Sequence, residues 1–227
     1  MIGSQGIPKK VGANIEFAGW LIIHPEWPVL ALSAACWVVM LFSSYSSHHL
    51  PAAQGWMLMV GGMMLPLQIA DVRRLAFRSK RATRQVTVLL FIFANALLWA
   101  VIAIPAVTIT SSWTHPNYLS SGLFIVAAIW TQTNAFKIAL WKCHSERSVY
   151  VDGWPWVLST LNEGFRLGYY CILTCLPAMI ACAVSHHFYP VMIFGFVSAY
   201  MLRSSPIVST RTVGLIHIGC AILVWPI

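Results

Sequence analysis

The sequence predicts an all-α protein, a polytopic bundle of transmembrane helices. Hydrophobic residues make up 59% of the 227 positions and charged residues only 9%, whereas a soluble domain carries about 25% charged residues. A hydrocarbon core about 30 Å thick takes roughly 20 apolar residues per helix, and several stretches of the chain are close to that length. We therefore expect the lipid bilayer to be the first partner of this chain.

Three spans are expected in the first half of the chain, at Trp27–Tyr45, Gly55–Ile69 and Val86–Thr108. Proline lacks the N–H that would donate to the carbonyl four residues earlier in a helix. Pro66, in the second span, therefore leaves the Gly62 carbonyl without its usual donor, and buried protein or a ligand must satisfy that carbonyl. Between the second and third spans we expect a loop with six basic residues: Arg73, Arg74, Arg78, Lys80, Arg81 and Arg84.

The second half of the chain supplies the remaining spans. The fourth is expected at Leu119–Trp141, and an amphipathic patch at Trp154–Leu161 leads into the fifth at Leu167–Val184. Two runs of only about 15 residues follow, against the roughly 20 that a span needs: Phe188–Leu202 and Thr212–Trp225. We therefore predict six or seven spans, with residues 1–26 as a cytoplasmic N-terminal segment and residues 27–227 as the transmembrane domain.

The distribution of charge predicts the orientation. With the N-terminus in the cytoplasm, every Lys and Arg falls at or near the cytoplasmic side, where the basic residues of short loops are retained. The segment Met1–Phe17 has no short apolar core followed by a cleavage site, so we expect no removable signal peptide. We predict a multi-pass protein of the bacterial inner membrane. Basic residues confined to short loops argue against nucleic acid as a partner.

The predicted outer loops hold five of the eight histidines and no Lys, Arg, Asp or Glu. These histidines are His48, His49, His115, His186 and His187. One interpretation is a metal-accepting or proton-sensing surface, since imidazole binds metals and titrates near neutral pH. The other is that histidine suits interfacial loops as a polar, mostly neutral residue. We favour the second, because adjacent pairs in loops show no fixed ligand spacing.

The fifth span carries the most informative candidates for metal binding. Cys171 and Cys175 are four residues apart, so both thiols project from one face of a helix, with Met179 at the edge of the same stripe. Thiolate and thioether ligands favour copper(I) over magnesium or calcium. The alternative is that these side chains only pack, since a free cysteine behaves as a small buried hydrophobe. Helical spacing by itself favours packing.

The same span is expected to kink and to pack closely against a neighbour. Pro177 removes a backbone hydrogen bond and clashes with the Leu173 carbonyl, which predicts a kink beside Cys175. Gly164 and Gly168 have the small-xxx-small spacing that lets another helix approach.

Two further groups contain candidate ligands. Cys143 and His144 follow the fourth span on the cytoplasmic side, where Cys143 and Cys171 are expected to meet, and three thiols with an imidazole suffice for a closed site. Alternatively, Cys143 and His144 are ordinary residues of a cytoplasmic loop. The second span has four methionines within eight positions, which either supply thioethers or fill irregular gaps in a core: Met57, Met59, Met63 and Met64.

Few ionisable residues lie within the predicted spans or at their ends. Glu163 and Arg166 are three residues apart and are expected to pair with each other, whereas His217 lies inside the last span, where an ionisable residue is a functional hypothesis by default. No nucleotide-binding loop, serine-nucleophile elbow or two-histidine zinc-protease motif is present in the sequence, so we expect no enzymatic activity.

Three blocks of this sequence resemble the predicted metal-binding integral membrane proteins of domain-of-unknown-function family 2182. Met57–Pro66 is similar to the family's methionine-rich stretch ending in Met-Met-x-Pro. Gln132–Ser145 is similar to its Gln…Leu-Lys…Cys-x-x-x-Cys-Arg-Ser block, and Gly164–Met179 to its Gly…Gly-x-Tyr-Cys-x-Gly-Cys-Cys-Trp-x-x-Met block. The resemblance extends from about Gly55 to the C-terminus and implies a membrane protein that binds metal.

The chain departs from the family pattern at several positions. Ala139 stands where the family has the first cysteine of the second block, and Thr174 replaces one of the paired cysteines of the third. Leu173 replaces a glycine and Leu176 a tryptophan. Of about five family cysteines, Cys143, Cys171 and Cys175 remain.

From spacing and resemblance together we predict an integral membrane protein that binds a soft metal ion, copper or zinc, with copper(I) favoured. The predicted ligands are Cys143, Cys171, Cys175, Met179, Met63, Met64 and His144. The alternative is a non-catalytic accessory or structural subunit of a larger membrane complex, whose partners are other membrane subunits or further copies of this chain.

Overall fold

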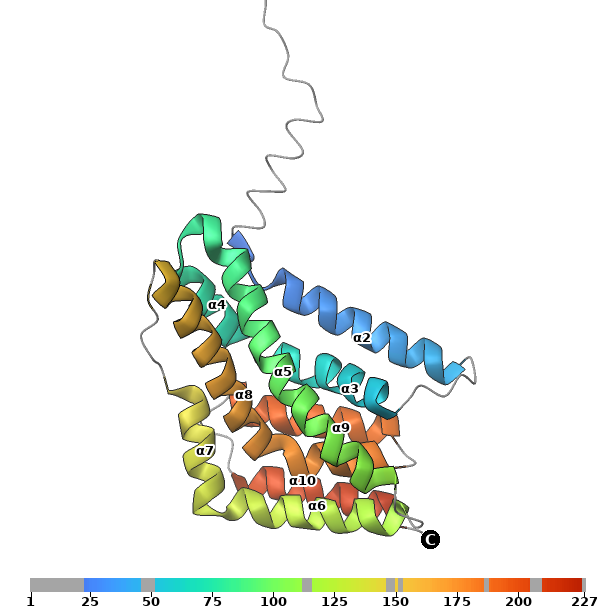
Figure 1. The fold of residues 1–227 in the computed structure, drawn as a ribbon. Helices are drawn as coiled ribbons and strands as arrows, with labels where there is room; N and C mark the ends of the chain where they lie inside the picture. The colour runs from blue at the N-terminus through green and yellow to red at the C-terminus, as the bar shows by residue number, and fades with distance from the viewer. Residues whose placement is uncertain are drawn as a thin grey trace, which may run out of the picture.

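The computed structural model describes residues 23–45, 52–111, 116–145, 150, 153–185, 188–204 and 210–225. All regular structure within these residues is helical, which confirms the predicted all-α class (Figure 1). The elements are α2 (Trp27–Tyr45), α3 (Ala52–Leu67), α4 (Ile69–Arg78), the 3-10 turn η1 (Arg81–Thr83), α5 (Arg84–Ser111), α6 (Pro116–Gln132), α7 (Asn134–His144), α8 (Gly153–Val184), α9 (Phe188–Ser204) and α10 (Thr210–Val224). The five histidines of the predicted outer loops lie outside the described residues.

Length and apolar composition identify two to four candidate membrane spans among the described residues. Arg81–Thr108 and Gly153–Val184 are each long and apolar enough to cross a bilayer. Two bent pairs, α3 with α4 and α6 with α7, add two more spans if each pair counts as one. Three shorter apolar helices accompany them, at Trp27–Ser43, Pro190–Met201 and Thr210–Val224. The predicted total of six or seven spans therefore stays a prediction.

Two boundaries differ from the predicted ones in the first half of the chain. The chain bends by 63° between α3 and α4, and the predicted loop Arg73–Arg84 is wrong, because α4 continues to Arg78 and η1 follows. The reason is a helical stripe within the basic segment: Val72, Leu75 and Ala76 are buried on one face of α4, the three- and four-residue spacing of an amphipathic helix.

The fourth span is also not the single straight helix predicted at Leu119–Trp141. α6 and α7 meet at a bend of 77°, and Thr133 lies at the corner. Its side-chain oxygen accepts a hydrogen bond of 3.1 Å from the Phe136 N–H, which caps α7 and favours a new helix start over continuation. By contrast, the predicted patch Trp154–Leu161 and span Leu167–Val184 form one helix, α8.

Side chains of neighbouring helices bond the carbonyls that Pro66 and Pro177 leave without a donor. The Gly62 carbonyl accepts hydrogen bonds of 3.1 Å from both Ser33 Oγ and Trp37 Nε1 on α2, which confirms that buried protein satisfies it. The Leu173 carbonyl, which Pro177 cannot reach, accepts a hydrogen bond of 2.9 Å from Trp130 Nε1 on α6. These bonds join α2 to α3 and α6 to α8.

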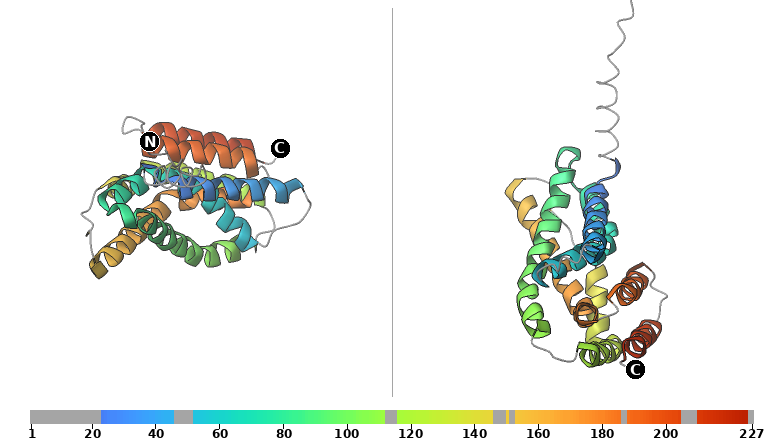
Figure 2. Two further views of the ribbon diagram at one scale, coloured as in Figure 1. Left: turned by 90° about the horizontal axis from the view of Figure 1, so that it is seen from above. Right: turned by 90° about the vertical axis from the view of Figure 1, so that its right-hand side faces the viewer.

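Glycines allow α5 and α8 to cross closely. A Cβ atom at Gly164 would lie 3.0 Å from the Phe91 carbonyl oxygen, and one at Gly168 would lie 2.8 Å from Asn95 Oδ1. The small-xxx-small spacing therefore lets α5 pack closely against α8. The sequence predicted this close approach without identifying the partner helix. On the other side of α8, helices α6, α9 and α10 run side by side, as the end-on view in Figure 2 shows.

Replacing Trp130 by phenylalanine tests the bond to the Leu173 carbonyl. The substitution leaves this carbonyl without its donor, so we expect the free energy of unfolding in detergent to fall by about 1–3 kcal/mol. In a Pro177→Ala background the residue 177 N–H supplies the missing bond, and the same Trp130→Phe change should cost clearly less. Equal losses in the two backgrounds would contradict this role of Trp130.

Candidate metal centre

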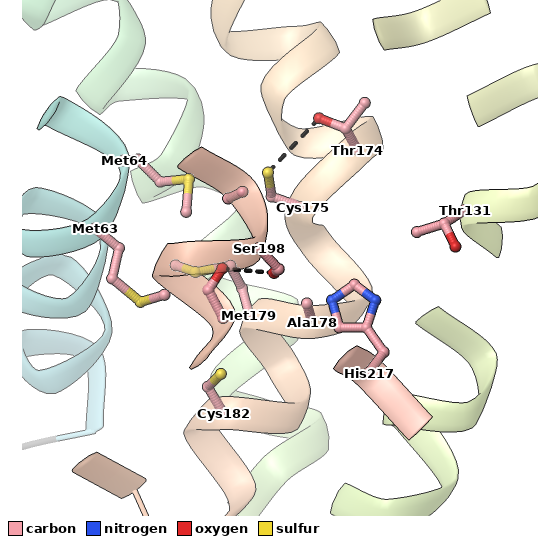
Figure 3. Close-up of a pocket in the computed structure, with 12 residues that line it drawn as sticks. Met63, Met64, Thr131, Thr174, Cys175, Ala178, Met179, Cys182, Ser198 and His217 are labelled. Carbon is pink, nitrogen blue, oxygen red and sulfur yellow. Dashed lines mark hydrogen bonds between the residues drawn. The ribbon is translucent and has the colours of Figure 1, made fainter. Parts of the chain in front are cut away.

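A cavity lies between α3, α8, α9 and α10, with the end of α6 beside it (Figure 3). Its volume is about 20 Å³, compared with the roughly 10–15 Å³ that one water molecule needs. Five of its lining side chains contain sulfur, a soft metal ligand: Met63, Met64, Cys175, Met179 and Cys182. The polar lining includes Thr131, Thr174, Ser198 and His217.

The closest sulfur contact joins α3 and α8. The Cys171 thiol donates to the Met64 thioether, with 3.6 Å between Sγ and Sδ. Each residue is only 1% exposed, and both belong to the larger of the two apolar cores. Residues that are 107 positions apart in the chain therefore place two soft donors side by side.

Thr174 occupies the position of one cysteine in the resembled family. Its hydroxyl donates to the Tyr170 carbonyl at 2.9 Å and lies 3.1 Å from the Cys171 carbonyl. The same oxygen is 3.6 Å from Cys175 Sγ. The hydroxyl is thus bonded to the backbone of its own helix while it borders the cavity.

Two side chains of the cavity that have a sulfur or an imidazole nitrogen were absent from the predicted ligand set, Cys182 and His217. Cys182 follows Cys175 by seven residues on the same face of α8, so its helical spacing could have included it. His217 comes from α10, and only its place inside an apolar span singled it out. Its side chain is buried, and its Nδ1 has no hydrogen-bond partner among the described residues.

Cys143 lies elsewhere in the fold. It is buried in the second apolar core with Phe91 and Leu167, whereas Cys171 belongs to the first. His144 ends α7. In the part of the chain that the structure describes, no three His, Cys, Asp or Glu side chains are grouped so as to hold a metal. The structure thus brings together Met63, Met64, Cys171, Cys175 and Met179, without Cys143.

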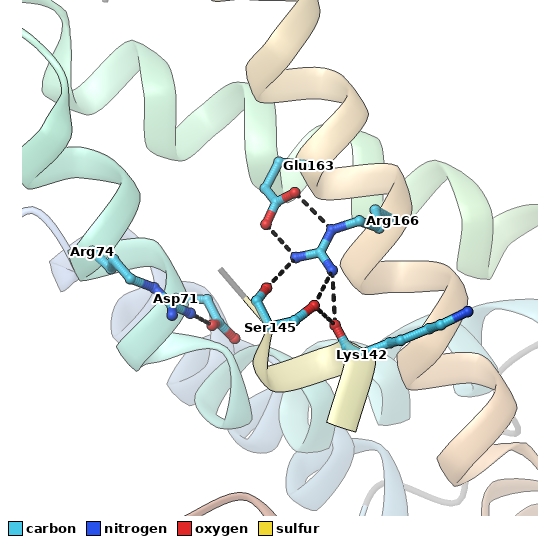
Figure 4. A network of polar contacts seen from close by, with 6 residues as sticks. All are labelled: Asp71, Arg74, Lys142, Ser145, Glu163 and Arg166. Carbon is cyan, nitrogen blue, oxygen red and sulfur yellow. Dashed lines mark hydrogen bonds and ion pairs between the residues drawn. The ribbon is translucent and has the colours of Figure 1, made fainter. Parts of the chain in front are cut away.

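An ion pair on α8 fastens the end of α7 beside Cys143. Arg166 binds Glu163 through two hydrogen bonds of 2.7 and 2.5 Å, which confirms the predicted pairing. The same guanidinium donates to the Lys142 carbonyl at 2.7 Å and to the Ser145 carbonyl at 2.8 Å (Figure 4). Carbonyls at a helix C-terminus have no partner within the helix, so Arg166 acts as a cap for α7. Asp71 and Arg74 form a separate pair on α4.

Fold and cavity together define a bundle of apolar helices that encloses a site rich in thiols and thioethers. A family model named PpoB2, described as a copper chaperone, matches residues 53–227. The chain belongs to this copper chaperone family, which indicates a copper-related function. No curated protein and no solved structure matches the chain. The match supports copper as the metal and gives no support to zinc, and it does not confirm the name of family 2182.

Replacing Arg166 by glutamine tests the cap on α7. The change leaves the buried Glu163 carboxylate unpaired and releases the two carbonyls, and breaking a buried pair on one side typically costs about 3–5 kcal/mol. We expect a loss of that order in the free energy of unfolding in detergent. The double variant Glu163→Gln/Arg166→Gln should recover part of the loss. A double variant no more stable than the single one would contradict the pairing argument.

Proposed function

We propose that this protein binds copper(I) as cargo through the sulfur atoms of α3 and α8 and passes it on without chemical change. The observation that carries the proposal is the Cys171–Met64 contact, in which a thiol and a thioether from different helices approach to 3.6 Å. Cys175 and Met179 continue the same face of α8 toward the cavity, where Met63 also lies.

The spacing of this pair suits a shared ion. Two metal–sulfur bonds of about 2.3 Å, the length found in zinc thiolates, place their sulfurs roughly 3.8 Å apart at a tetrahedral angle. The observed separation of 3.6 Å therefore allows one ion to replace the thiol hydrogen with little movement of either helix.

Charge also favours copper(I) in this environment. A buried charge is costly unless it is paired, and loss of the Cys171 proton leaves one negative charge for one monovalent cation. The ion and the thiolate together are then neutral, and thioethers add soft ligands without adding charge. A divalent ion at the same thiolate would leave one positive charge uncompensated within the apolar core.

The arrangement of the helices favours a chain that traverses the membrane repeatedly. The right-hand side of Figure 1 holds the end of α2 and the start of α3, the end of α5 and the start of α6, and the end of α8 and the start of α9. The opposite ends of these helices lie toward the left. This order supports our proposal that the shorter apolar helices also cross, for a total of seven crossings. We propose that the basic ends of α4 and α5 face the cytoplasm, with the bacterial inner membrane as the location.

We further propose a non-catalytic role that depends on partners. Cargo must come from a donor and go to an acceptor, so other membrane proteins or a further copy of this chain are the expected partners besides lipid. The exposed apolar side chains of α2 and α5, such as Phe42, Phe93 and Ile104, provide surface for lipid or for such subunits.

Replacing both Cys171 and Cys175 by serine tests the cargo site. The purified chain should bind copper(I) in near-stoichiometric amount, and the double variant should lose it, because a serine hydroxyl is a poor ligand for this soft ion. Copper would be measured by mass spectrometry after competition with a chelator of known affinity. Met64→Leu, which removes only a thioether, should weaken binding without abolishing it.

Two single-cysteine variants serve as controls. Cys36→Ser, at a buried thiol of α2, should leave bound copper unchanged. Cys143→Ser should also leave it unchanged, since Cys143 lies in the other apolar core. Loss of copper in Cys143→Ser would instead favour the predicted site that includes Cys143 and His144. Full retention in the Cys171→Ser/Cys175→Ser variant would contradict the proposal.

A further inference from the structure

The imidazole of His217 brings a nitrogen donor to the cavity. His217 is 5% exposed and lines the cavity opposite the methionines of α3 in the view of Figure 3. Its Nδ1 has no hydrogen-bond partner among the described residues. A buried polar atom without a hydrogen-bond partner destabilises the folded state, so a ligand bound at this nitrogen would stabilise the protein.

The rest of α10 holds this imidazole firmly. Its ring stacks on Phe124 of α6, with 6.3 Å between centroids and 26° between planes. One turn further along α10, Ser121 Oγ on α6 donates to the Ala221 carbonyl at 3.0 Å. One turn before, Gly214 permits close approach, since a Cβ atom there would lie 2.6 Å from Gln132 Nε2. The ring therefore lies between Phe124 and the cavity.

Gln132 fixes the start of α10 as well. Its amide donates 2.9 Å hydrogen bonds to the Thr210 carbonyl and to Thr131 Oγ1. Contacts on both sides of His217 thus position the imidazole through α6, a helix that also donates to the Leu173 carbonyl of α8 through Trp130. Helix α6 therefore bonds to both α8 and α10, which form two walls of the cavity.

We infer that His217, Cys175 and Met179 form a second copper(I) site, distinct from the Cys171–Met64 pair. The inference rests on the proposed function, because it assumes that copper(I) is the cargo. Cys175 and Met179 are four residues apart on one face of α8 and border the same cavity as His217. One thiolate, one thioether and one neutral imidazole supply three donors that suit copper(I) and balance its single charge.

A second site gives the cargo a route of transfer between α8 and α10. Cys171 and Cys175 are one helical turn apart, so an ion leaving the first pair can take the second thiolate before it loses all its first ligands. The thiol proton of Cys175 is released as the copper–sulfur bond forms, and the Cys171 thiolate regains a proton as its bond breaks, so the net charge of the two sites is conserved. The second site therefore lies on the α10 side of the route.

The test is X-ray absorption spectroscopy on the full chain loaded with copper(I) from a chelator-buffered solution. The unmodified protein should hold about two equivalents, with sulfur scattering and the outer-shell signature of imidazole. Cys171→Ser/Met64→Leu should keep about one equivalent with the imidazole signature, and His217→Leu/Cys175→Ser about one equivalent with sulfur only. His217→Met should keep binding but give an all-sulfur spectrum, which separates ligation from loss of folding.

The outcomes distinguish the two proposals. No bound copper in the unmodified protein would overturn the proposed function itself. About one equivalent with sulfur only, unchanged in His217→Met, would leave the cargo site at Cys171–Met64 intact and overturn the second site alone. Thermal unfolding of each variant without copper verifies that the helices remain assembled.

Discussion

The arrangement of this protein depends on one constraint, that a backbone carbonyl freed by proline inside an apolar bundle must find another donor. Pro66 lies two residues after Met64 and Pro177 two residues after Cys175. Indole donors bond the carbonyls that these two prolines free, Trp37 to Gly62 and Trp130 to Leu173. These bonds also join α3 to α2 and α8 to α6, close to the candidate ligands on α3 and α8.

The bundle separates two kinds of chemistry along α8. Near the beginning of this helix, Glu163 and Arg166 form a hard, charged centre that caps α7. Farther along, Cys171 and Cys175 face thioethers in an apolar core that also contains Met63 and Met64. Arg166 is bonded to Glu163 and to the carbonyls at the end of α7, so this ion pair needs no partner from the sulfur site. A soft cation that is held by neutral thioethers and one thiolate fits the second environment, where a hydrated divalent ion would be poorly accommodated.

Hydropathy predicted much of the fold, and α2 has the predicted bounds, Trp27–Tyr45. Hydropathy failed at Thr133, because the apolar residues on both sides of the polar stretch 131–134 were joined into one predicted span. In the structure a side-chain cap at Thr133 starts a new helix there. For the site, the four-residue spacing correctly placed Cys171 and Cys175 on one face, and the methionine-rich run of α3 lies beside them. The positions of Cys143 and His217 could not be predicted, since only the tertiary packing of α7 and α10 decides which side chains lie beside the sulfur atoms. Local spacing contains no information about contacts between residues 107 positions apart.

The most direct test of the central claim is the position of copper itself. Crystals of the copper(I)-loaded protein would give an anomalous difference map at the copper absorption edge. We expect a peak between α3 and α8, within bonding distance of Cys171 Sγ and Met64 Sδ. A peak beside Cys143 at the end of α7, or copper bound only at the surface of the bundle, would contradict it.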